Sequence, residues 1–173
     1  MPIKLLSTIQ HEEEPLESLL IDCVKSGASV GFIAPLQQYD AKQYWQQVET
    51  DLLAGSRKLL VFYVEKQIAG ALQLSFCQKA NGLHRADVEK LMVHSDFRQQ
   101  GIGRQLLEFA EKFALENHRS LLVLDTRTND VASYLYCQQG YIEVGKIPKF
   151  VTNEKNEFES TTIFYKLLCD QIE

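Results

Sequence analysis

The sequence lacks a basic excess, a long apolar run and an abundance of proline. Its 173 residues carry a formal net charge of −5 and only four prolines. The negative charge argues against broad electrostatic binding to nucleic acid, because such binding needs a basic face. No stretch approaches the ~20 apolar residues of a membrane span, and Met1 to Leu6 is too short an apolar stretch for a secretion signal. We therefore expect no nucleic-acid partner, no membrane partner and a cytoplasmic location.

Cysteine is also scarce, and the four thiols are widely separated along the chain. They form no C-x-x-C pair, and no histidine stands at the spacing of a zinc site. A disulfide framework is not expected in a chain of this size without a secretion signal. We expect no metal site and four reduced thiols, at Cys23, Cys77, Cys137 and Cys169.

The composition is that of an ordinary globular protein. Hydrophobic residues make up 45% and charged residues 24% of the chain, which is unlike a disordered segment. The length suffices for one well-buried core and is short for two typical domains. The sequence therefore predicts a single domain over residues 1–173.

Hydrophobic periodicity predicts an alternating set of helices and strands. Apolar residues three and four apart indicate helices, whereas short β-branched or apolar runs indicate strands. We expect helices over 15–23, 40–53, 102–114 and 130–139, and strands over 58–64, 68–76, 85–93, 120–124, 141–145 and 161–168. A polar loop is expected over 152–159. This order predicts a mixed α/β domain of the α+β-like kind.

The turn from Arg98 to Gly103 carries the strongest chemical signal. It joins a predicted strand to a predicted amphipathic helix and reads Arg98-Gln99-Gln100-Gly101-Ile102-Gly103, followed by Arg104. A helix N-terminus presents free N–H groups to an anion, and glycine lets a bulky anion approach closely. The turn is therefore a candidate phosphate site, although glycines at such a junction also occur as plain turn residues.

Two common phosphate loops do not fit this turn. A Walker loop ends in Gly-Lys-Ser or Gly-Lys-Thr, whereas Arg104 and Gln105 follow Gly103. A dinucleotide fingerprint needs a third glycine or an alanine where Leu106 stands.

R-x-x-G-x-G at this place resembles the coenzyme A pyrophosphate loop of the GNAT N-acetyltransferase superfamily. The segment from Asn129 through Ala132, Leu135-Tyr136 and Gly140-Tyr141 resembles the superfamily pattern N-x-x-A-x-x-L-Y-x-x-x-G-[FY]. Nearly the whole chain, including residues 26–32 and 84–87, is similar to the tabtoxin-resistance type of acetyltransferase.

The resemblance implies a GNAT fold and acetyl-coenzyme A as co-substrate, with no metal. The expected fold is a central, mostly antiparallel twisted sheet, splayed at the coenzyme A cleft and flanked by about four helices. The resemblance assigns binding of the pantetheine arm to the backbone of Leu91, Met92 and Val93. It places Asn129 near that arm and Tyr136 near the thiol.

Acetyl transfer to an amine needs a route for the amine proton and an acid for the departing thiolate. The resemblance assigns the acid to Tyr136 and suggests Asp87 and Asp125 for the proton route. Alternation along the strand 85–93 would put Asp87, Glu89, Leu91 and Val93 on one face, so Glu89 is a further candidate. Salt bridging or capping by these carboxylates is the plain alternative.

We therefore expect an acetyl-coenzyme A-dependent N-acetyltransferase acting on a primary amine of a small molecule, amino-acid-like or a β-lactam toxin or antibiotic. Three alternatives stay open: a protein or peptide N-acetyltransferase, a non-catalytic acyl-coenzyme A sensor, and a nucleotide-binding regulatory module. The chain could be a monomer or a homodimer.

Overall fold

The computed structural model describes residues 2–168 of the chain. Four α-helices and seven strands make up the fold. In chain order they are β1 (Ile3–Leu6), α1 (Glu13–Lys25), α2 (Gln38–Leu53), β2 (Arg57–Val64), β3 (Gln67–Phe76), β4 (Arg85–Val93), α3 (Ile102–Glu116), β5 (Leu121–Arg127), α4 (Val131–Gln138), β6 (Ile142–Thr152) and β7 (Phe158–Leu167). Short 3₁₀ turns lie at Ala80–Gly82 and Ser95–Phe97.

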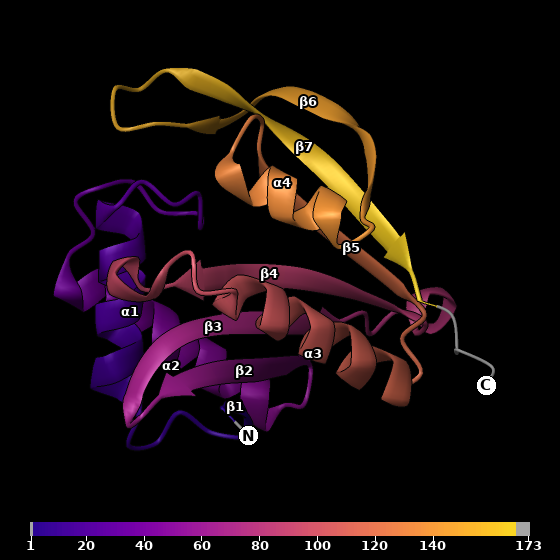
Figure 1. Cartoon of the computed structure of the whole chain (residues 1–173), viewed down its shortest axis with the longest axis horizontal. Coiled ribbons are helices and arrows are strands. Elements are labelled where there is room, and N and C mark those ends of the chain that lie inside the picture. Colours follow the sequence, from indigo (N-terminus) through magenta and orange to yellow (C-terminus); the bar gives the residue numbers. More distant parts are fainter. Residues whose placement is uncertain (1, 169–173) are drawn as a thin grey trace.

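All seven strands belong to one sheet in the order β1-β2-β3-β4-β5-β7-β6 (Figure 1). Neighbouring strands are antiparallel except for β4 and β5, which run parallel. The mixed, mostly antiparallel sheet with its four helices confirms the fold class expected from the sequence.

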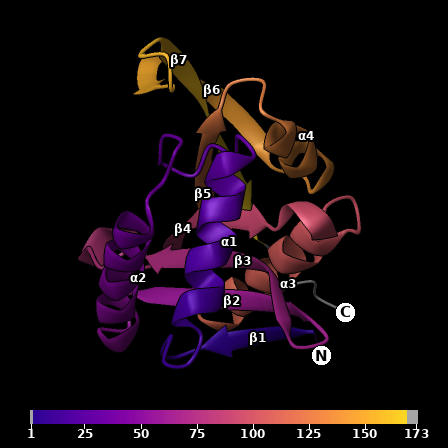
Figure 2. The same cartoon turned by 90° about the vertical axis from the view of Figure 1, so that its left-hand side faces the viewer.

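The helices cover the sheet in two separate layers (Figures 1 and 2). Apolar side chains of α1 and α2, with Trp45 at their centre, pack against one face of β2 to β4. Those of α3 pack against the other face of these strands around Leu106, whereas α4 packs against β6 and β7, where Tyr136 contacts Phe164. Each layer buries the apolar stripe of its helices, so both faces of β2 to β4 are lined with apolar side chains.

The sheet opens between its two parallel strands. Cα pairing of β4 with β5 covers only Arg85–Asp87 against Leu121–Val123, although β4 continues to Val93 and β5 to Arg127. Beyond that point the two strands diverge, as Figure 1 shows. The facing backbone edges of residues 88–93 and 124–127 are therefore left without a strand partner on that side.

The expectation that one face of β4 carries Asp87, Glu89, Leu91 and Val93 is wrong, because the strand has a β-bulge at Lys90. The pairing of β4 with β3 shifts register between Ala71 and Gln73, and Lys90 has a positive φ of 51°. An extra residue in one strand reverses the faces of all residues beyond it. Leu91 and Val93 consequently face the α3 side, whereas Asp87 and Glu89 face the α1–α2 side.

Several element boundaries also differ from the expected ones. Strand β1 was not expected, and α2 begins at Gln38 rather than at Asp40. Strands β6 and β7 are longer than expected, so the polar loop shrinks from 152–159 to 153–157. Side chains along β6 are mostly exposed, and an exposed strand needs no apolar alternation.

Two further findings concern metals and membranes. Residues 2–168 hold no group of three or more His, Cys, Asp or Glu side chains placed to bind a metal ion. None of the helices described is long and apolar enough to cross a membrane. Cys23, Cys77 and Cys137 are free thiols, and Cys169 lies outside the described residues.

Candidate active site

The N-terminus of α3 has backbone N–H groups that no side chain caps. Gly101 is its N-cap, with φ at 76°, and no side chain caps the helix. The first intrahelical bond runs from Gln105 N–H to the Gly101 carbonyl, which leaves the N–H groups of residues 102–104 available. Residues 98–101 are exposed. The expected phosphate turn is thus a helix N-terminus that an anion can reach.

The two arginines beside this turn are held by the protein itself. Arg98 donates from Nε to the Val93 carbonyl at 3.1 Å and from its guanidinium to the Ser26 hydroxyl. Arg104 pairs with Glu108 at 2.7 Å. Arg98 therefore connects the turn to the end of β4 and the end of α1, and the anion-binding groups presented by the turn are its backbone N–H donors.

Gly103 lies where three elements approach one another. A Cβ at this position would stand 3.2 Å from Leu135 Cδ2 of α4, and 3.8 and 3.9 Å from side-chain carbons of Val93 and Leu91. The start of α3 thereby adjoins both the unpaired end of β4 and α4. The turn, the backbone of Leu91 to Val93 and the helix that carries Tyr136 meet at the opening between β4 and β5.

Tyr136 is buried on the α3–α4 side of the sheet. Its ring packs at 5.8 Å from that of Tyr141 and 6.0 Å from that of Phe164. Burial, followed by the negative charges of Asp130 and Asp125, raises the pKa of the Tyr136 hydroxyl above its usual value. This hydroxyl stays protonated over the working pH range. Asn129 occupies an exposed turn just before α4, with φ at 64°.

Asp87 and Asp125 lie on the same face of the sheet. Asp87 pairs in register with Val123, and Asp125 is two residues further along β5, so both point to the α1–α2 side. Burial, then the charges of Glu89 and Asp125, raises the pKa of Asp87, while Arg85 lowers it. Asp125 is exposed and accepts a hydrogen bond from the Thr161 hydroxyl at 3.1 Å.

Glu89 is bound within a polar network on that face. Its carboxylate pairs with Arg57 at 2.8 Å, and Arg57 also bonds the Gln73 side chain at 2.5 Å and Asp51 at 3.1 Å. Tyr44 of α2 donates to Gln73 at 3.0 Å. These contacts tie β2, β3, β4 and α2 together immediately before the bulge, and they occupy the Glu89 carboxylate.

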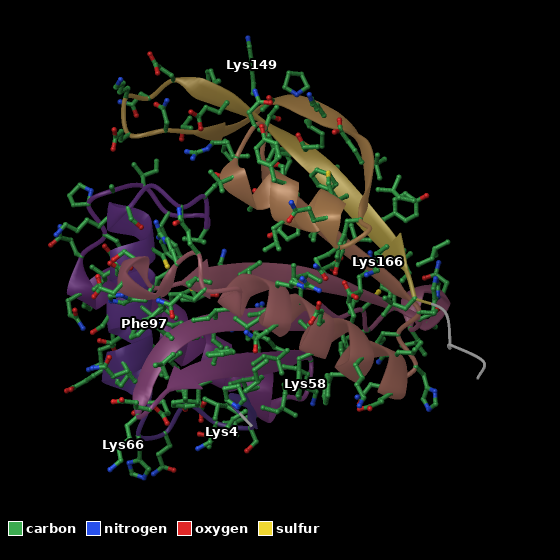
Figure 3. All side chains as sticks on the ribbon, viewed as in Figure 1. Lys4, Lys58, Lys66, Phe97, Lys149 and Lys166 are labelled. Carbon is green, nitrogen blue, oxygen red and sulfur yellow. The ribbon has the colours of Figure 1, made fainter. Side chains whose placement is uncertain are left out.

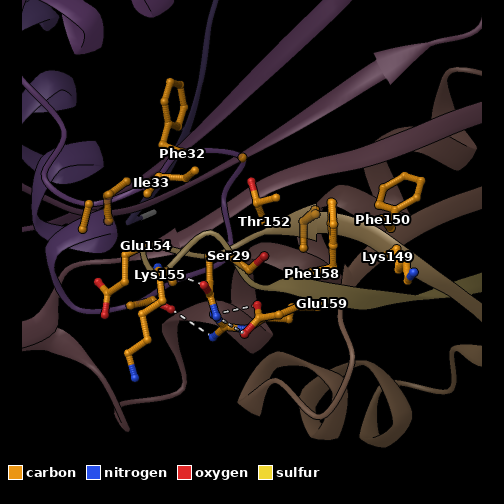
Figure 4. A pocket seen from close by; sticks show the side chains of 18 residues that line it. Ser29, Phe32, Ile33, Lys149, Phe150, Thr152, Glu154, Lys155, Phe158 and Glu159 are labelled. Atoms are coloured by element: carbon orange, nitrogen blue, oxygen red, sulfur yellow. Dashed lines mark hydrogen bonds and ion pairs between the residues drawn. The ribbon is translucent and has the colours of Figure 1, made fainter.

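A pocket of about 570 Å³ lies between the α1–α2 connection and the β6–β7 hairpin (Figure 4). Phe32 and Ile33 stand on one side of it, and Phe150 and Phe158 on the other. Arg127 contributes the inner wall, where it bonds the Gly27 carbonyl, Asp130 and Glu159.

The sequence did not single out this pocket. Its lining comes from segments far apart in the chain, and much of it belongs to the part of β6 that was not expected to be a strand. Arg127 would have been detectable in principle, because it stands two residues beyond Asp125 on the same strand face.

Comparison with known proteins agrees with this geometry. Residues 19–153 match the family model described as the acetyltransferase (GNAT) domain. The chain belongs to this family of acetyltransferases.

Two relatives of this chain are streptothricin acetyltransferases. The chain is 29% identical over 104 residues to streptothricin acetyltransferase from Escherichia coli, a match spanning 60% of this chain and 57% of that protein's length. It is 23% identical over 131 residues to streptothricin acetyltransferase A from Bacillus subtilis (strain 168), which covers 72% of this chain and 73% of the relative.

Solved structures share the fold over nearly the whole chain. Ribosomal-protein-alanine N-acetyltransferase from Brucella melitensis superposes with a TM-score of 0.79 at 22% identity, covering 95% of this chain and 99% of that one. The yncA protein of Salmonella typhimurium, solved with its cofactor acetyl-CoA, gives 0.78 at 14% identity, covering 100% and 98%. At these identities the likeness concerns the fold.

Proposed function

We propose that the protein is an acetyl-coenzyme A-dependent N-acetyltransferase that acetylates a primary amine of a small molecule. The observation that carries the proposal is the opening between β4 and β5 beside an uncapped α3 N-terminus. One place thereby offers an unpaired strand edge, a set of free helical N–H groups and two carboxylates. Family membership and the acetyl-CoA found in yncA support coenzyme A as the donor.

The residues fit the donor in two ways. The pyrophosphate would accept hydrogen bonds from the N–H groups at the turn from Arg98 to Gly103. The pantetheine arm would lie along the unpaired edge of Leu91 to Val93, as an added strand does, using main-chain groups. Asn129 would contact the arm from the turn before α4. Bound acetyl-coenzyme A supplies the activated acetyl thioester.

The acceptor amine would approach from the α1–α2 side. Asp87 and Asp125 would attract its ammonium form and pass the proton to solvent through a water, which leaves a neutral amine to attack. Glu89 would act as a positioning residue, because Arg57 already binds its carboxylate. Tyr136, kept protonated, would donate a proton to the departing thiolate. Most of the acceleration would come from holding both reactants in one cleft.

The remainder of the acceptor would occupy the pocket between the α1–α2 connection and the β6–β7 hairpin. Asp125 and Arg127 stand two residues apart on one strand face, about 7 Å along β5, which links the amine end to the pocket wall. A pocket of this volume is in the range of drug-sized ligands. Streptothricin, named in both curated relatives, is the first acceptor to test.

Donor binding is tested by calorimetry with acetyl-coenzyme A and the variant Gly103→Trp. An indole at position 103 would fill the junction with Leu135, Val93 and Leu91, and we expect at least a tenfold loss of affinity. Lys112→Trp is the matched control, because it places the same indole at an exposed position of α3. Equal affinity of wild type and a folded Gly103→Trp variant would refute the assigned donor site.

A further inference from the structure

Lys90 is the residue at the β4 bulge, and its side chain extends to the α1–α2 side of the sheet. Its ammonium nitrogen lies 5.7 Å from the ring centroids of both Phe32 and Tyr44. A Cβ at Gly31 would stand 3.0 Å from the same nitrogen, so the glycine leaves room for the ammonium. The lysine is thus held in a half-buried niche that α2, the α1–α2 connection and β4 form together.

The charge of Lys90 has no partner within residues 2–168. Burial lowers its pKa and Arg57 lowers it further, while Glu89 and Asp125 act in the opposite direction without a hydrogen bond to it. Neither carboxylate forms an ion pair with Lys90: Glu89 pairs with Arg57, and Asp125 accepts from the Thr161 hydroxyl and keeps its charge. A half-buried ammonium with three donors and no acceptor costs free energy, of which the aromatic rings recover a part.

The niche adjoins both halves of the proposed site. Lys90 directly precedes Leu91, at which the edge proposed for the pantetheine arm begins. Gly31 and Phe32 also line the pocket between the α1–α2 connection and the β6–β7 hairpin. A molecule that enters from this pocket toward Asp125 would therefore meet carboxylates and one uncompensated ammonium on the same face.

We propose that Lys90 is a specificity-determining residue that binds a carboxylate of the acceptor. The inference rests on the proposed function, because it names the acceptor class for the same cleft. The ammonium of such an acceptor pairs with Asp125 and Asp87, and its carboxylate accepts charge-assisted hydrogen bonds from Lys90. The preferred acceptors are then amines that carry a carboxylate, as amino acids and amino-acid-like compounds do.

The test uses acceptors in matched sets: an amino acid, its carboxamide and its decarboxylated amine, for aromatic, aliphatic and basic side chains. Thiol release from acetyl-coenzyme A gives kcat and KM for each compound with wild type, Lys90→Met and Lys90→Arg. Lys42→Met is the matched control, because it removes the same charge at an exposed position of α2 that does not line this pocket. Lys90→Met keeps the aliphatic volume of the niche and removes an uncompensated cation, so folding is preserved.

We expect wild type to favour the carboxylate-bearing member of a set by about 10–100-fold in kcat/KM, the strength of a hydrogen bond to a charged group. Lys90→Met should abolish this preference, mainly by raising the KM for the amino acid, and Lys90→Arg should retain part of the preference. The control variant should show the same preference as wild type.

Two results overturn the inference and leave the proposed function intact. One is turnover of decarboxylated amines at rates equal to or above those of the amino acids. The other is an equal loss for all members of a set in Lys90→Met, which is the result of a purely structural role. A third result would refute the proposed function: acetyl-coenzyme A binds, but neither streptothricin nor any compound of the sets causes release of its thiol. The assignment of Lys90 would then fail as well.

Discussion

Asp87 and Asp125 stand on two parallel strands, on one face of the sheet, at the point where those strands part. Burial, then the like charges of Glu89 and Asp125, raises the pKa of Asp87 against the opposing charge of Arg85. A carboxylate whose ionisation is opposed by burial and by neighbouring like charges does not contribute to stability when it is ionised. Two carboxylates in this position are well suited to attract an ammonium and to accept its proton.

Asp87→Asn is expected to lower activity and raise stability. A raised carboxyl pKa means that the folded state binds the proton more tightly than the unfolded state does. Ionisation of Asp87 therefore costs stability as the pH rises from 3.8, the unfolded value, through the higher folded pKa. At pH 7 the variant should have a higher Tm and a lower kcat, and the Tm difference should vanish below pH 3.8. A lower Tm at pH 7 would contradict the sign of this argument.

Asp125→Asn should reduce kcat by about 100-fold, the usual lower range for loss of a proton-transfer group. The carboxamide keeps the shape of the side chain and can still accept from the Thr161 hydroxyl, so thermal melting should change little. The measurement is kcat and kcat/KM against pH for a fixed acceptor. Thr161→Val, which removes only that hydroxyl, is the control. Full activity of Asp125→Asn at every pH would exclude the proton route.

Tyr136→Phe removes a hydroxyl that forms no hydrogen bond with residues 2–168 and leaves the ring between Tyr141 and Phe164. The fold should therefore persist while kcat falls by about 100-fold through loss of the acid. Wild type should show no alkaline decline from this group below about pH 10, because its pKa is raised. Tyr134→Phe, an exposed neighbour on α4, should behave as wild type. Identical rates for Tyr136→Phe and wild type would remove the acid role.

Asp22→Asn should weaken acetyl-coenzyme A binding by loosening the turn before α3. Asp22 accepts from the Ser95 N–H at 2.8 Å and from its hydroxyl at 2.7 Å. Burial alone would raise the pKa of Asp22, but these hydrogen bonds and the charges of His94 and Arg98 lower it overall. The stabilisation is thus complete above the unfolded pKa of 3.8 and is lost as the pH falls through the lower folded value.

The readouts for Asp22→Asn are the KM for acetyl-coenzyme A, expected to rise several-fold, and the pH dependence of Tm. Asp96→Asn, an exposed acid of the same segment, serves as the comparison. Equal KM values for wild type and Asp22→Asn would show that the hydrogen bonds between Asp22 and Ser95 do not support the donor site.

Sequence patterns predicted the order of the elements because most of them bury a regular apolar stripe. Helix α3 begins at Ile102 as expected, and the phosphate turn lies at its N-terminus. Strand β1 was not predicted, because its four residues at the edge of the sheet are too few to show a clear apolar pattern. Most of β6 was not predicted, because its exposed side chains show no apolar alternation. Lys149, for example, extends outward from this strand (Figure 3).

The bulge at Lys90 marks the limit of reasoning from alternation. A period of two along residues 85–93 grouped Asp87 and Glu89 with Leu91 and Val93, and one inserted residue separated the pairs. The same bulge places Lys90 beside Phe32 and Tyr44, a contact between segments far apart in the sequence. Local sequence patterns predict the helices and strands, whereas the arrangement of charges in the cleft depends on strand register and tertiary packing.

The most direct test of the account is release of the coenzyme A thiol from acetyl-coenzyme A with a panel of amines that includes streptothricin, followed by the mass of the product. We expect stoichiometric thiol release with at least one small primary amine and a product heavier by one acetyl group on that amine. Tight binding of acetyl-coenzyme A without thiol release for any amine would contradict the account, because it would describe a sensor rather than an enzyme.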